Sequence, residues 1–531
     1  MRGAVYAILP LLIAFALRLY PTSLSSLPFS TDAWSPIRNT EIILEYTPVS
    51  LDSGMLDDYN SYWPANSLFG AVFSLITGLK PIVAMAVGIP LAGALTIPIF
   101  YALALRISRS HELAFFSSIL LATSYPYTLF TSGVTKETYA NPLYMLSMLI
   151  FLSRGKWRKA LLFVIASLVL AMAHHLTALV AIAVMTSIAL ASSIIMVRRG
   201  SSLDKPGFLF VSIITAVTAL YFGLYAYRGL KVAVTPSDLL SVASYQILAL
   251  AIMLYLVFKL RILLGCITST TIVSLIAFLS TVRPMMSDAP LLPSHYTLYA
   301  APFILASPLI VLGIEELRSM KGENHLAPLF WLSTLVGLEA YAVFGNQPLG
   351  LTLAYRTLNF LCMPLVMLSA FGLHRTYKDR SRPRGKRTWK AVAISVLTVM
   401  AVLSSYGVYA SVSLQERYMG YFWLYRQPEY FAAVWIKDAA YSQTIAGDVK
   451  ASYLLRDYFG LDVNVIGGLQ YLTGKTDYKP QILFIYGQMS RNGYVVYGGY
   501  SVDLPENWAE KLYDLGLSYS NGAVYIYGGK A

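Results

Sequence analysis

Long apolar runs separated by short polar connections occupy the chain from residue 4 to residue 411. Many of these runs approach the roughly 20 residues that a helix needs to cross a bilayer. The pattern therefore predicts a polytopic α-helical membrane protein with about thirteen membrane-spanning helices. We expect these helices at 4–20, 82–105, 113–132, 138–153, 160–175, 176–197, 207–226, 239–258, 262–281, 298–314, 327–344, 357–373 and 391–411.

One further apolar run, at residues 67–79, is too short to span a bilayer. If it were a crossing, the basic connections that contain Arg106, Arg109 and residues 154–159 would move to the other side of the membrane. We therefore expect residues 67–79 to form a short interfacial or re-entrant helix within a long first loop, 21–81.

The stretch 160–197 is too long for one crossing, because its roughly 38 residues would form a helix about 57 Å long at 1.5 Å per residue. Basic clusters lie at both of its ends. The chain is therefore expected to turn near His174 and His175, which places both imidazoles at the outer membrane face.

Residues 412–531 follow a different pattern, with mixed charge and many turn residues. Apolar strands, with helical segments around them, are expected at 444–448, 461–467 and 481–487. Asn521 and Gly522 supply the turn of a final hairpin. The pattern predicts a small α/β domain at 412–531 that follows a membrane domain at 1–411.

The composition, with 56% hydrophobic and 13% charged residues, excludes an ordinary soluble globule. The first apolar run could be a cleaved signal peptide. It has no small-x-small site before Pro21, and Arg18 interrupts its end, so we interpret it as a retained first span. Cys266 and Cys362 both fall in apolar runs and imply no disulfide framework.

The formal net charge of +13 would suggest a nucleic-acid partner in a soluble protein, but its distribution indicates membrane topology instead. More than half of the 40 lysine and arginine residues fall in alternate connections on one side. This pattern predicts a cytoplasmic N-terminus and an extracytoplasmic terminal domain in a cell-membrane protein. We expect membrane lipid as a partner, with the basic run 374–390 near anionic lipid, and no nucleic acid.

Ionisable groups inside or at the mouth of a helical bundle are costly, so their positions are functional evidence. In this chain they collect in the loops that are predicted to lie outside. Carboxylate, imidazole and guanidinium groups from separate loops on one side suggest a shared cavity. The candidates are Arg18, Asp32, Lys136, Glu137, His174, His175, Arg228, Asp288, His295 and Arg356.

The acidic residues of the first loop also have structural interpretations. Glu41 and Glu45, at helical spacing, would cap or coat a surface helix. Asp57 and Asp58 would form a solvated turn rather than a metal site.

The other candidates have structural interpretations as well. The histidine pair would complete helix ends through hydrogen bonds, and Lys136 with Glu137 would form a loop ion pair. Arg18 and Arg356 would extend toward lipid headgroups.

The residue types suggest chemistry on a phosphate. Arginine binds phosphate through bidentate, charge-assisted hydrogen bonds. A carboxylate can act as general base, or it can hold a Mg²⁺ or Mn²⁺ ion that neutralises a leaving phosphate. Paired histidines would favour a softer metal. The residues alone leave these alternatives open.

The order of these parts resembles the type C (GT-C) glycosyltransferases, which include oligosaccharyltransferases, protein O-mannosyltransferases and lipid A aminoarabinose transferases. A first span ends in Arg18, and a long loop with Asp32 follows. The resemblance continues through YWPANSLFGAVFSLITGLKP, TKETYANP, AHHLTA and YRTLNFLCMPLVMLSAFGL. The segments EYFAAVWIKDAA, IAGD and SYSNGAVYIYG are similar to outer domains of prokaryotic, especially archaeal, members.

The resemblance implies a donor in which a sugar is linked to a polyprenyl phosphate or diphosphate. It implies an inverting displacement on the outer face of the membrane. Asp32 would be the catalytic carboxylate of the first loop, as base or metal ligand. Glu137, which matches the acidic position of the second loop, would be the second catalytic residue. Asp32 and Glu137 would hold Mg²⁺ or Mn²⁺ if the enzyme uses a metal.

By the same resemblance, His174, His175 and Arg356 would line the donor phosphate pocket. Arg18 would position the first loop. Further outer-loop contacts are expected from Lys136, Arg228, Asp288 and His295.

The sequence departs from the resembling enzymes at two places. It has no WWDYG segment, which oligosaccharyltransferases use to read the acceptor sequon. It also has Lys136 and Glu137 where those enzymes carry a pair of the DxD type. The acceptor, whether protein, glycan or lipid, and the need for a metal are therefore left open.

The main alternative function is a lipid-linked glycan flippase or transporter without glycosyl transfer. Transporters place their polar site near the bilayer midplane on broken helices, whereas the ionisable groups here cluster at the outer helix ends. An envelope-assembly scaffold without catalysis is a third interpretation. The outer-end clustering favours surface chemistry on a lipid headgroup.

Overall fold

The structure is a computed structural model that describes most of the chain. The described residues are 2–46, 48–50, 54–57, 59–153, 157–229, 235–284, 290–320, 324–345, 350–378, 386–439, 443–496 and 501–528. Two compact units divide the chain. The helical unit comprises Met1–Arg18, Leu91–Thr131 and Lys136–Val408, and the mixed unit comprises Leu19–Pro90, Ser132–Thr135 and Tyr409–Ala531. The boundary expected at residue 411 between a membrane domain and an outer domain stays a prediction.

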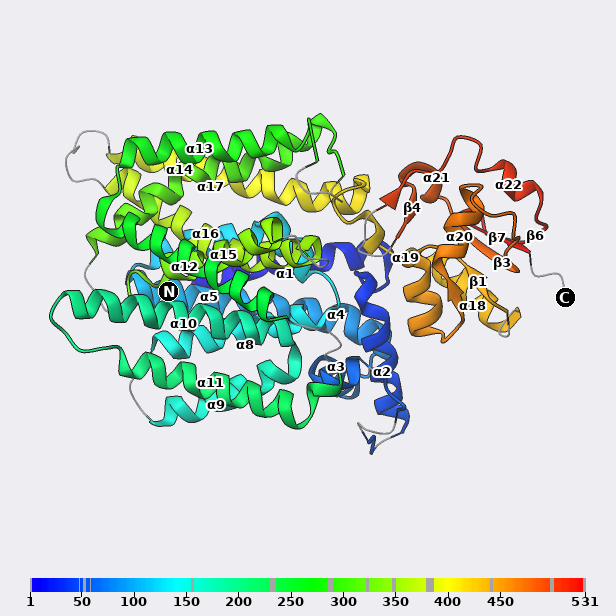
Figure 1. The fold of residues 1–531 in the computed structure, drawn as a ribbon, viewed down its shortest axis with the longest axis horizontal. Coiled ribbons are helices and arrows are strands. Elements are labelled where there is room, and N and C mark those ends of the chain that lie inside the picture. The colour runs from blue at the N-terminus through cyan, green and yellow to red at the C-terminus, as the bar shows by residue number, and fades with distance from the viewer. Residues whose placement is uncertain are drawn as a thin grey trace. The chain divides into compact units, whose positions relative to one another are not determined.

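Long helices form almost all of the helical unit (Figure 1). Two of its helices, α1 (Arg2–Ser25) and α4 (Pro81–Ala94), continue into the mixed unit. The others are α5 (Thr96–Ser108), α6 (His111–Thr123), α7 (Tyr125–Thr131), α8 (Lys136–Leu152), α9 (Trp157–Ala173), α10 (His175–Arg198), α11 (Lys205–Leu224), α12 (Pro236–Lys259), α13 (Ile262–Leu279), α14 (Thr297–Ser319), α15 (Ala327–Phe344), α16 (Gly350–Lys378) and α17 (Lys386–Tyr409).

Helices occupy all thirteen ranges in which the sequence predicts a crossing. In the part of the chain that the structure describes, ten spans are long and apolar enough to cross a membrane, and a bent pair makes eleven. The helices α8 and α9 are shorter, with 17 residues each. The polytopic helical fold is therefore confirmed, although fewer helices than expected reach full span length.

The segment predicted as one span at 113–132 is bent by 63° between α6 and α7. Pro126 explains the break, because a proline inside a helix lacks the N–H donor and its ring clashes with the carbonyl four residues earlier, whereas it is tolerated in the first turn of α7. The interruption falls at Ser124, whose ψ of 113° is not helical.

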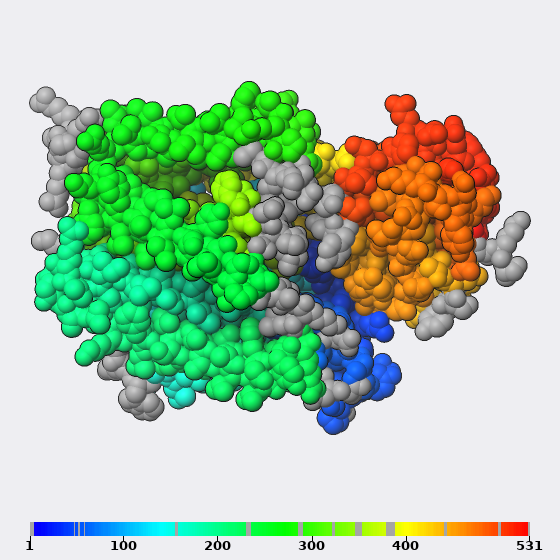
Figure 2. Space-filling view, in the orientation of Figure 1, coloured from blue at the N-terminus to red at the C-terminus, as the bar shows by residue number. Residues whose placement is uncertain are grey.

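The outward-facing helices of the helical unit carry apolar side chains on their surfaces. None of the 18 residues of α13 is buried, and Leu263, Ile267 and Ile272 are exposed. Figure 2 shows α12 and α13, in green, at the surface of this unit. Such surfaces are stable in a bilayer, where lipid chains take the place of a protein core.

Two glycines bring α14 and α16 into backbone contact. A Cβ atom at Gly313 would lie 2.0 Å from the Leu368 carbonyl oxygen, and one at Gly372 would lie 2.0 Å from the Leu309 carbonyl oxygen. Small residues permit such close crossings of membrane helices. This contact fixes α16, the helix that carries Arg356.

The mixed unit contains the long first loop and the C-terminal domain (Figure 1). Its first-loop elements are η1 (Thr31–Ala33), α2 (Trp34–Glu45), η2 (Asn60–Tyr62) and α3 (Ala65–Thr77). The short apolar helix α3 is the one predicted at 67–79, and its interfacial position stays a prediction. The later helices are η6 (Ala410–Leu414), η7 (Tyr421–Trp423), α18 (Gln427–Ala439), α19 (Val449–Ser452), η8 (Tyr453–Tyr458), α20 (Val465–Leu472), α21 (Met489–Asn492) and α22 (Glu510–Tyr513).

A five-stranded sheet with strand order β2-β1-β3-β7-β6 lies in the C-terminal domain. The strands β1 (Ile445–Ala446), β2 (Val463–Asn464) and β3 (Ile482–Tyr486) are parallel, and β7 (Val524–Gly528) pairs antiparallel with β3 and with β6 (Leu517–Ser520). The strands β4 (Tyr494–Val495) and β5 (Ser501–Val502) form a separate pair. The predicted strands and the hairpin at Asn521-Gly522 are thus confirmed, although 465–467 begin a helix.

Candidate functional site

Five side chains that the sequence predicts to share a site lie close together, with the amide of Asn359, at one end of α8, α10 and α16. We call this group the Glu137 cluster. Its members are Lys136, Glu137, His174, His175, Arg356 and Asn359. All six belong to the helical unit.

Glu137 lies in the first turn of α8 with only 1% of its side chain exposed. The helix dipole favours a carboxylate at this position. Asn359 Nδ2 donates to Oε1 at 2.7 Å, and Arg356 Nη1 lies 3.7 Å from Oε2. Arg356 and Asn359, three residues apart on α16, therefore hold the carboxylate from one helix face. The contact between Arg356 and Glu137 is an ion pair, in which the carboxylate neutralises the charge of the guanidinium group.

Aromatic packing fixes α8 against α15 and α16. The ring of Tyr144 lies 6.0 Å from Trp331 of α15 and 5.7 Å from Phe360 of α16, in edge-to-face arrangements. All three side chains are buried. Because Phe360 follows Asn359 directly, this packing sets the position of the hydrogen bond to Glu137.

Arg356 differs from Glu137 in its exposure. About a third of its side chain, 31%, is accessible, although the carboxylate beside it is buried. A guanidinium group has five N–H donors, so a pair with one carboxylate is compatible with further hydrogen bonds to a phosphate. Arg356 is therefore the member of the cluster best placed to contact a ligand.

The histidine pair lies where the helical chain is interrupted. His174 has an extended backbone between α9 and α10, as expected for a break near this pair. His174 Nδ1 and Thr177 Oγ1 form a hydrogen bond of 2.7 Å, and the ring centroids of His174 and His175 are 4.9 Å apart. His174 lies within electrostatic range of Lys136 and Arg356. These two cations favour a ligand of negative charge.

Arg18 has a different environment from the one expected. It is fully buried in α1, where Nη1 donates to the Ala14 carbonyl at 3.4 Å and Cζ lies 5.2 Å from the centroid of the Tyr127 ring. This position does not fit the alternative of a side chain that extends to lipid headgroups. Its predicted role in positioning the first loop stays a prediction.

Asp32 lies in the mixed unit, in the short helix η1, and its side chain is exposed. The residue two positions before it, Ser30, has φ 95° and ψ 140°. Non-glycine residues rarely adopt this conformation, and such strain persists where the surrounding structure enforces it. Ser30 Oγ accepts a hydrogen bond from Asp32 N at 3.2 Å. The backbone that presents Asp32 is thus held in one conformation.

Asp57 is hydrogen-bonded rather than solvated. It accepts hydrogen bonds from Ser35 Oγ, from Asn60 Nδ2 and, at 2.9 Å, from Tyr59 N. Its own N–H donates to Asn39 Oδ1 at 3.2 Å. Asp57 therefore joins α2 to η2. The neighbouring Asp58 lies outside the described residues.

Asp457 of η8 is an acidic residue of this region that sequence reasoning missed. Burial is the main reason why its pKa is raised, and repulsion from Asp57 and Asp32 raises the pKa further. These three carboxylates therefore interact although they lie at opposite ends of the sequence, which no local pattern could show. Glu41 accepts from Tyr458 Oη at 2.9 Å, and burial raises its pKa. Glu41 is half-buried and accepts a hydrogen bond from η8, and its interpretation as a residue that caps or coats a surface helix stays a prediction.

Three further residues were predicted to contact the ligand, and the two that the structure describes lie against aromatic rings. Arg228 lies over the ring of Tyr227, at 5.4 Å. His295 packs against the rings of Tyr296 and Tyr299, at 4.8 and 6.5 Å. Asp288 lies outside the described residues.

The surroundings of Glu137 do not favour a metal ion. Within the described ranges, no three His, Cys, Asp or Glu side chains are grouped so that they could hold a metal ion. Glu137 is hydrogen-bonded by an amide and paired with a guanidinium group, which are donors that compete with a cation.

The sequence itself matches no known protein-family profile and no curated protein. The fold is similar to that of the Archaeoglobus fulgidus oligosaccharyltransferase in its complex with Zn and sulfate. That match has a TM-score of 0.61 and 14% identity, and it covers 99% of this chain and 73% of the other. The same enzyme tethered to an acceptor peptide with an NVT sequon matches with a TM-score of 0.57 and 13% identity, over 100% of this chain and 74% of the other.

The protein therefore shares its fold with this oligosaccharyltransferase, as the resemblance to the type C enzymes implied. The similarity extends over nearly the whole chain, including the C-terminal domain. At 14% identity this similarity defines the fold, whereas the chemistry depends on the side chains of the site.

Proposed function

We propose that the protein transfers a sugar from a polyprenyl-phosphate-linked donor to an acceptor on the outer face of the membrane, with inversion at the anomeric carbon. The observation that carries this proposal is the Glu137 cluster, in which a partly exposed Arg356 lies beside a buried carboxylate and near Lys136 and the histidine pair. The fold and the resemblance of the first loop and TKETYANP support the reaction class.

The Glu137 cluster would bind the donor phosphate. Arg356 donates to the phosphate oxygens, and Lys136 adds a second positive charge. Glu137 has a different role from the one first expected, because Asn359 and Arg356 already engage its carboxylate. It orients Arg356 rather than taking a proton. The donors are arranged to stabilise the charge that develops on the leaving phosphate.

Asp32 would act on the acceptor. The acceptor oxygen or nitrogen attacks the anomeric carbon, and a glycosidic bond forms as the bond from that carbon to the donor phosphate oxygen breaks. The electron pair leaves with the phosphate, and the Asp32 carboxylate takes the acceptor proton. A single displacement of this kind inverts the configuration at the anomeric carbon.

The test uses the purified full chain in lipid, with polyprenyl-phosphate and polyprenyl-diphosphate sugars labelled in the sugar. We expect the label to move to an acceptor, and Asp32→Asn to lower the turnover by about 10²–10⁴-fold, the usual contribution of a general base. Asp514→Asn, which changes an exposed carboxylate of the same unit, is the control. Undiminished turnover in Asp32→Asn would refute its role, and flux of donor across sealed vesicles without a new glycosidic bond would favour a transporter.

A further inference from the structure

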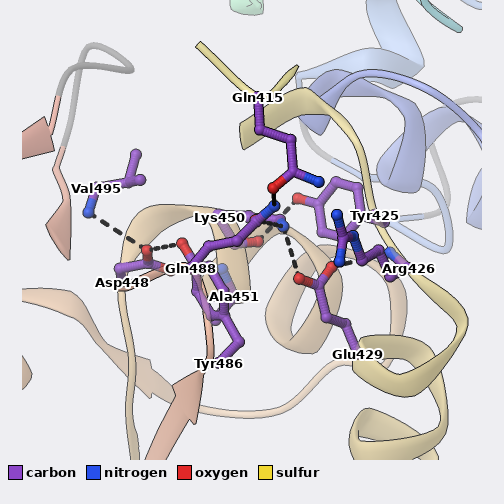
Figure 3. Close-up of polar contacts among 10 residues, drawn as sticks. All are labelled: Gln415, Tyr425, Arg426, Glu429, Asp448, Lys450, Ala451, Tyr486, Gln488 and Val495. Carbon is purple, nitrogen blue, oxygen red and sulfur yellow. Dashed lines mark hydrogen bonds and ion pairs between the residues drawn. The ribbon is translucent and has the colours of Figure 1, made fainter. Parts of the chain in front are cut away.

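A buried ion pair in the C-terminal domain lies among polar and aromatic side chains that the proposed reaction does not use. Lys450 Nζ donates to Glu429 Oε1 at 2.7 Å, and the two side chains are only 1% and 6% exposed. Figure 3 shows Lys450 between Tyr425, Glu429 and Gln488. We call these four residues the Lys450 network. Such a pair is costly to bury unless hydrogen bonds and geometry compensate for the lost hydration.

Compensating contacts surround both charges of this pair. Lys450 Nζ also donates to Gln488 Oε1 at 3.3 Å and lies 5.2 Å from the ring of Tyr425 and 4.6 Å from that of Tyr486. The second oxygen of Glu429 accepts from the backbone N–H of Arg426 at 3.0 Å. With both charges fully engaged, the network is a structural support and not an open binding site.

The network supports the segment 423–427 in particular. Tyr425 Oη donates to the Lys450 carbonyl oxygen at 2.8 Å, and the Arg426 N–H is held by Glu429. Gln427 Nε2 donates to the Ser25 carbonyl at 3.3 Å. Three consecutive residues of this segment are therefore fixed by named side-chain contacts.

The same segment holds the loop that presents Asp32. Phe29 and Leu424 form an antiparallel bridge, and Ser30 N donates to the Trp423 carbonyl at 3.0 Å. Beyond Asp32, the buried Trp34 packs edge-to-face on Tyr425, with ring centroids 5.0 Å apart. The segment 423–427 thus contacts residues that precede Asp32 and a residue that follows it in the sequence.

We infer that Lys450 and Glu429 are positioning residues for the Asp32 loop. They act through Tyr425 and the segment 423–427, which enforce the unusual backbone of Ser30 and so fix the direction of the Asp32 carboxylate. This inference rests on the proposed function only where it assigns Asp32 a catalytic role. The mechanical link from Lys450 to the loop is independent of it.

Hydrogen exchange of the full chain in lipid tests the link directly. We expect Lys450→Met to increase the exchange of amides 29–35 by roughly tenfold or more, because the substitution leaves Glu429 buried without its cation. Tyr425→Phe keeps the contact with Trp34 but removes the hydrogen bond to Lys450, and we expect a roughly threefold increase. Lys479→Met, which removes an exposed lysine of the same unit, should leave these amides unchanged.

Unchanged exchange at residues 29–35 in a folded Lys450→Met, with the amides of β3 still protected, would overturn the inference. If Lys450→Met fails to fold, Tyr425→Phe decides the question by the same criterion. Lys450→Arg retains the charge and should restore most of the protection.

Kinetics separate this inference from the proposed function. A loosened Asp32 loop should lower kcat and leave the KM for the donor unchanged, because donor binding is assigned to the Glu137 cluster. If Asp32→Asn keeps full turnover, the catalytic proposal fails, whereas the exchange result still decides whether Lys450 positions the loop. A Lys450→Met variant with raised donor KM and unchanged kcat would refute the positioning role.

Discussion

Two buried carboxylates of this protein are each paired with a cation, but their surroundings differ. Glu137 pairs with Arg356, whose side chain is 31% exposed. Glu429 pairs with Lys450, which is 1% exposed and covered by the rings of Tyr425 and Tyr486. A cation closed in on every side can only support the fold, whereas a cation that is still accessible can bind a ligand. The exposure of the cation therefore separates a structural ion pair from a candidate binding site.

The largest expected effect on stability comes from breaking the buried pair of Lys450 with Glu429. Glu429→Gln leaves Lys450 buried beside an uncharged amide, and removal of one partner of a buried pair costs roughly 3–5 kcal/mol. We expect a clear loss of thermal stability of the C-terminal domain, measured as the unfolding temperature of the purified protein in detergent. Asp514→Asn breaks an exposed pair with Lys479 and should change stability by less than about 1 kcal/mol. Equal losses of stability in Glu429→Gln and Asp514→Asn would contradict the distinction between the buried pair and the exposed pair.

Breaking the pair of Arg356 with Glu137, in which the cation is accessible, should affect activity more than stability. Arg356→Met removes a donor aimed at the leaving phosphate, and we expect turnover to fall by about 10²–10³-fold. We expect the unfolding temperature to fall less than in Glu429→Gln, because Asn359 still donates to the buried Glu137 carboxylate. Arg375→Met is a matched control, because Arg375 lies on the same helix, is also 31% exposed and pairs with Glu315 and Glu316. A stability loss without an activity loss in Arg356→Met would show that this pair is structural too.

A smaller effect is expected at Asn359, which sharpens the role of Glu137. Asn359→Ala leaves one carboxylate oxygen of Glu137 without its donor, at a cost of about 1–3 kcal/mol. Because Glu137 orients Arg356, we expect the KM for the donor to rise by roughly tenfold. Ser369→Ala, whose hydroxyl bonds to its own helix, is the control on α16. An unchanged KM would separate Asn359 from donor binding.

The smallest expected effect is a pH dependence of stability, caused by Asp448 near the buried pair of Lys450 and Glu429. Burial raises the pKa of Asp448 from 3.8 to about 6, although hydrogen bonds from Ala451, Tyr486 and Val495 act against the shift. The native state therefore binds this proton more tightly than the unfolded state. The contribution to stability is complete below about pH 3.8 and is lost as the pH rises through 6.

We expect the unfolding temperature of the protein relative to that of Asp448→Asn to decrease by a few degrees, at about 2–4 °C per kcal/mol, between about pH 4 and pH 7. The Asp448→Asn variant serves as the reference because its side-chain amide does not titrate in this range. If the unfolding temperatures of the protein and of Asp448→Asn changed in parallel over this pH range, the raised pKa of Asp448 would be contradicted.

Much of the fold could be predicted from the sequence, because a bilayer requires continuous apolar helices with internally satisfied backbones. The break at His174 and the short helix α3 followed from length and charge alone. The bend at Ser124 was missed, since the run 113–132 is apolar on both sides of Pro126. Hydropathy measures composition, and it does not detect a local backbone restriction.

The candidate site was only partly accessible to sequence reasoning. Lys136, Glu137, His174, His175 and Arg356 were selected because they share a predicted membrane face, and the structure brings them together. Asn359 was missed, although its place one helical turn after Arg356 on α16 was a usable signal. Asp457 had no such signal, because its interaction with Asp32 and Asp57 depends on contacts between distant segments.

The sequence by itself determined the helices, the basic loops and the α/β character of the end of the chain, because these depend on the local period of apolar residues and on charge. It also determined Asp32 and Arg356 as candidates. Only the tertiary structure decided which ion pair is closed and which is open, how Ser30 is held in its unusual conformation, and that Lys450 supports the Asp32 loop. These properties depend on burial and on partners far away in sequence, and no local pattern contains them.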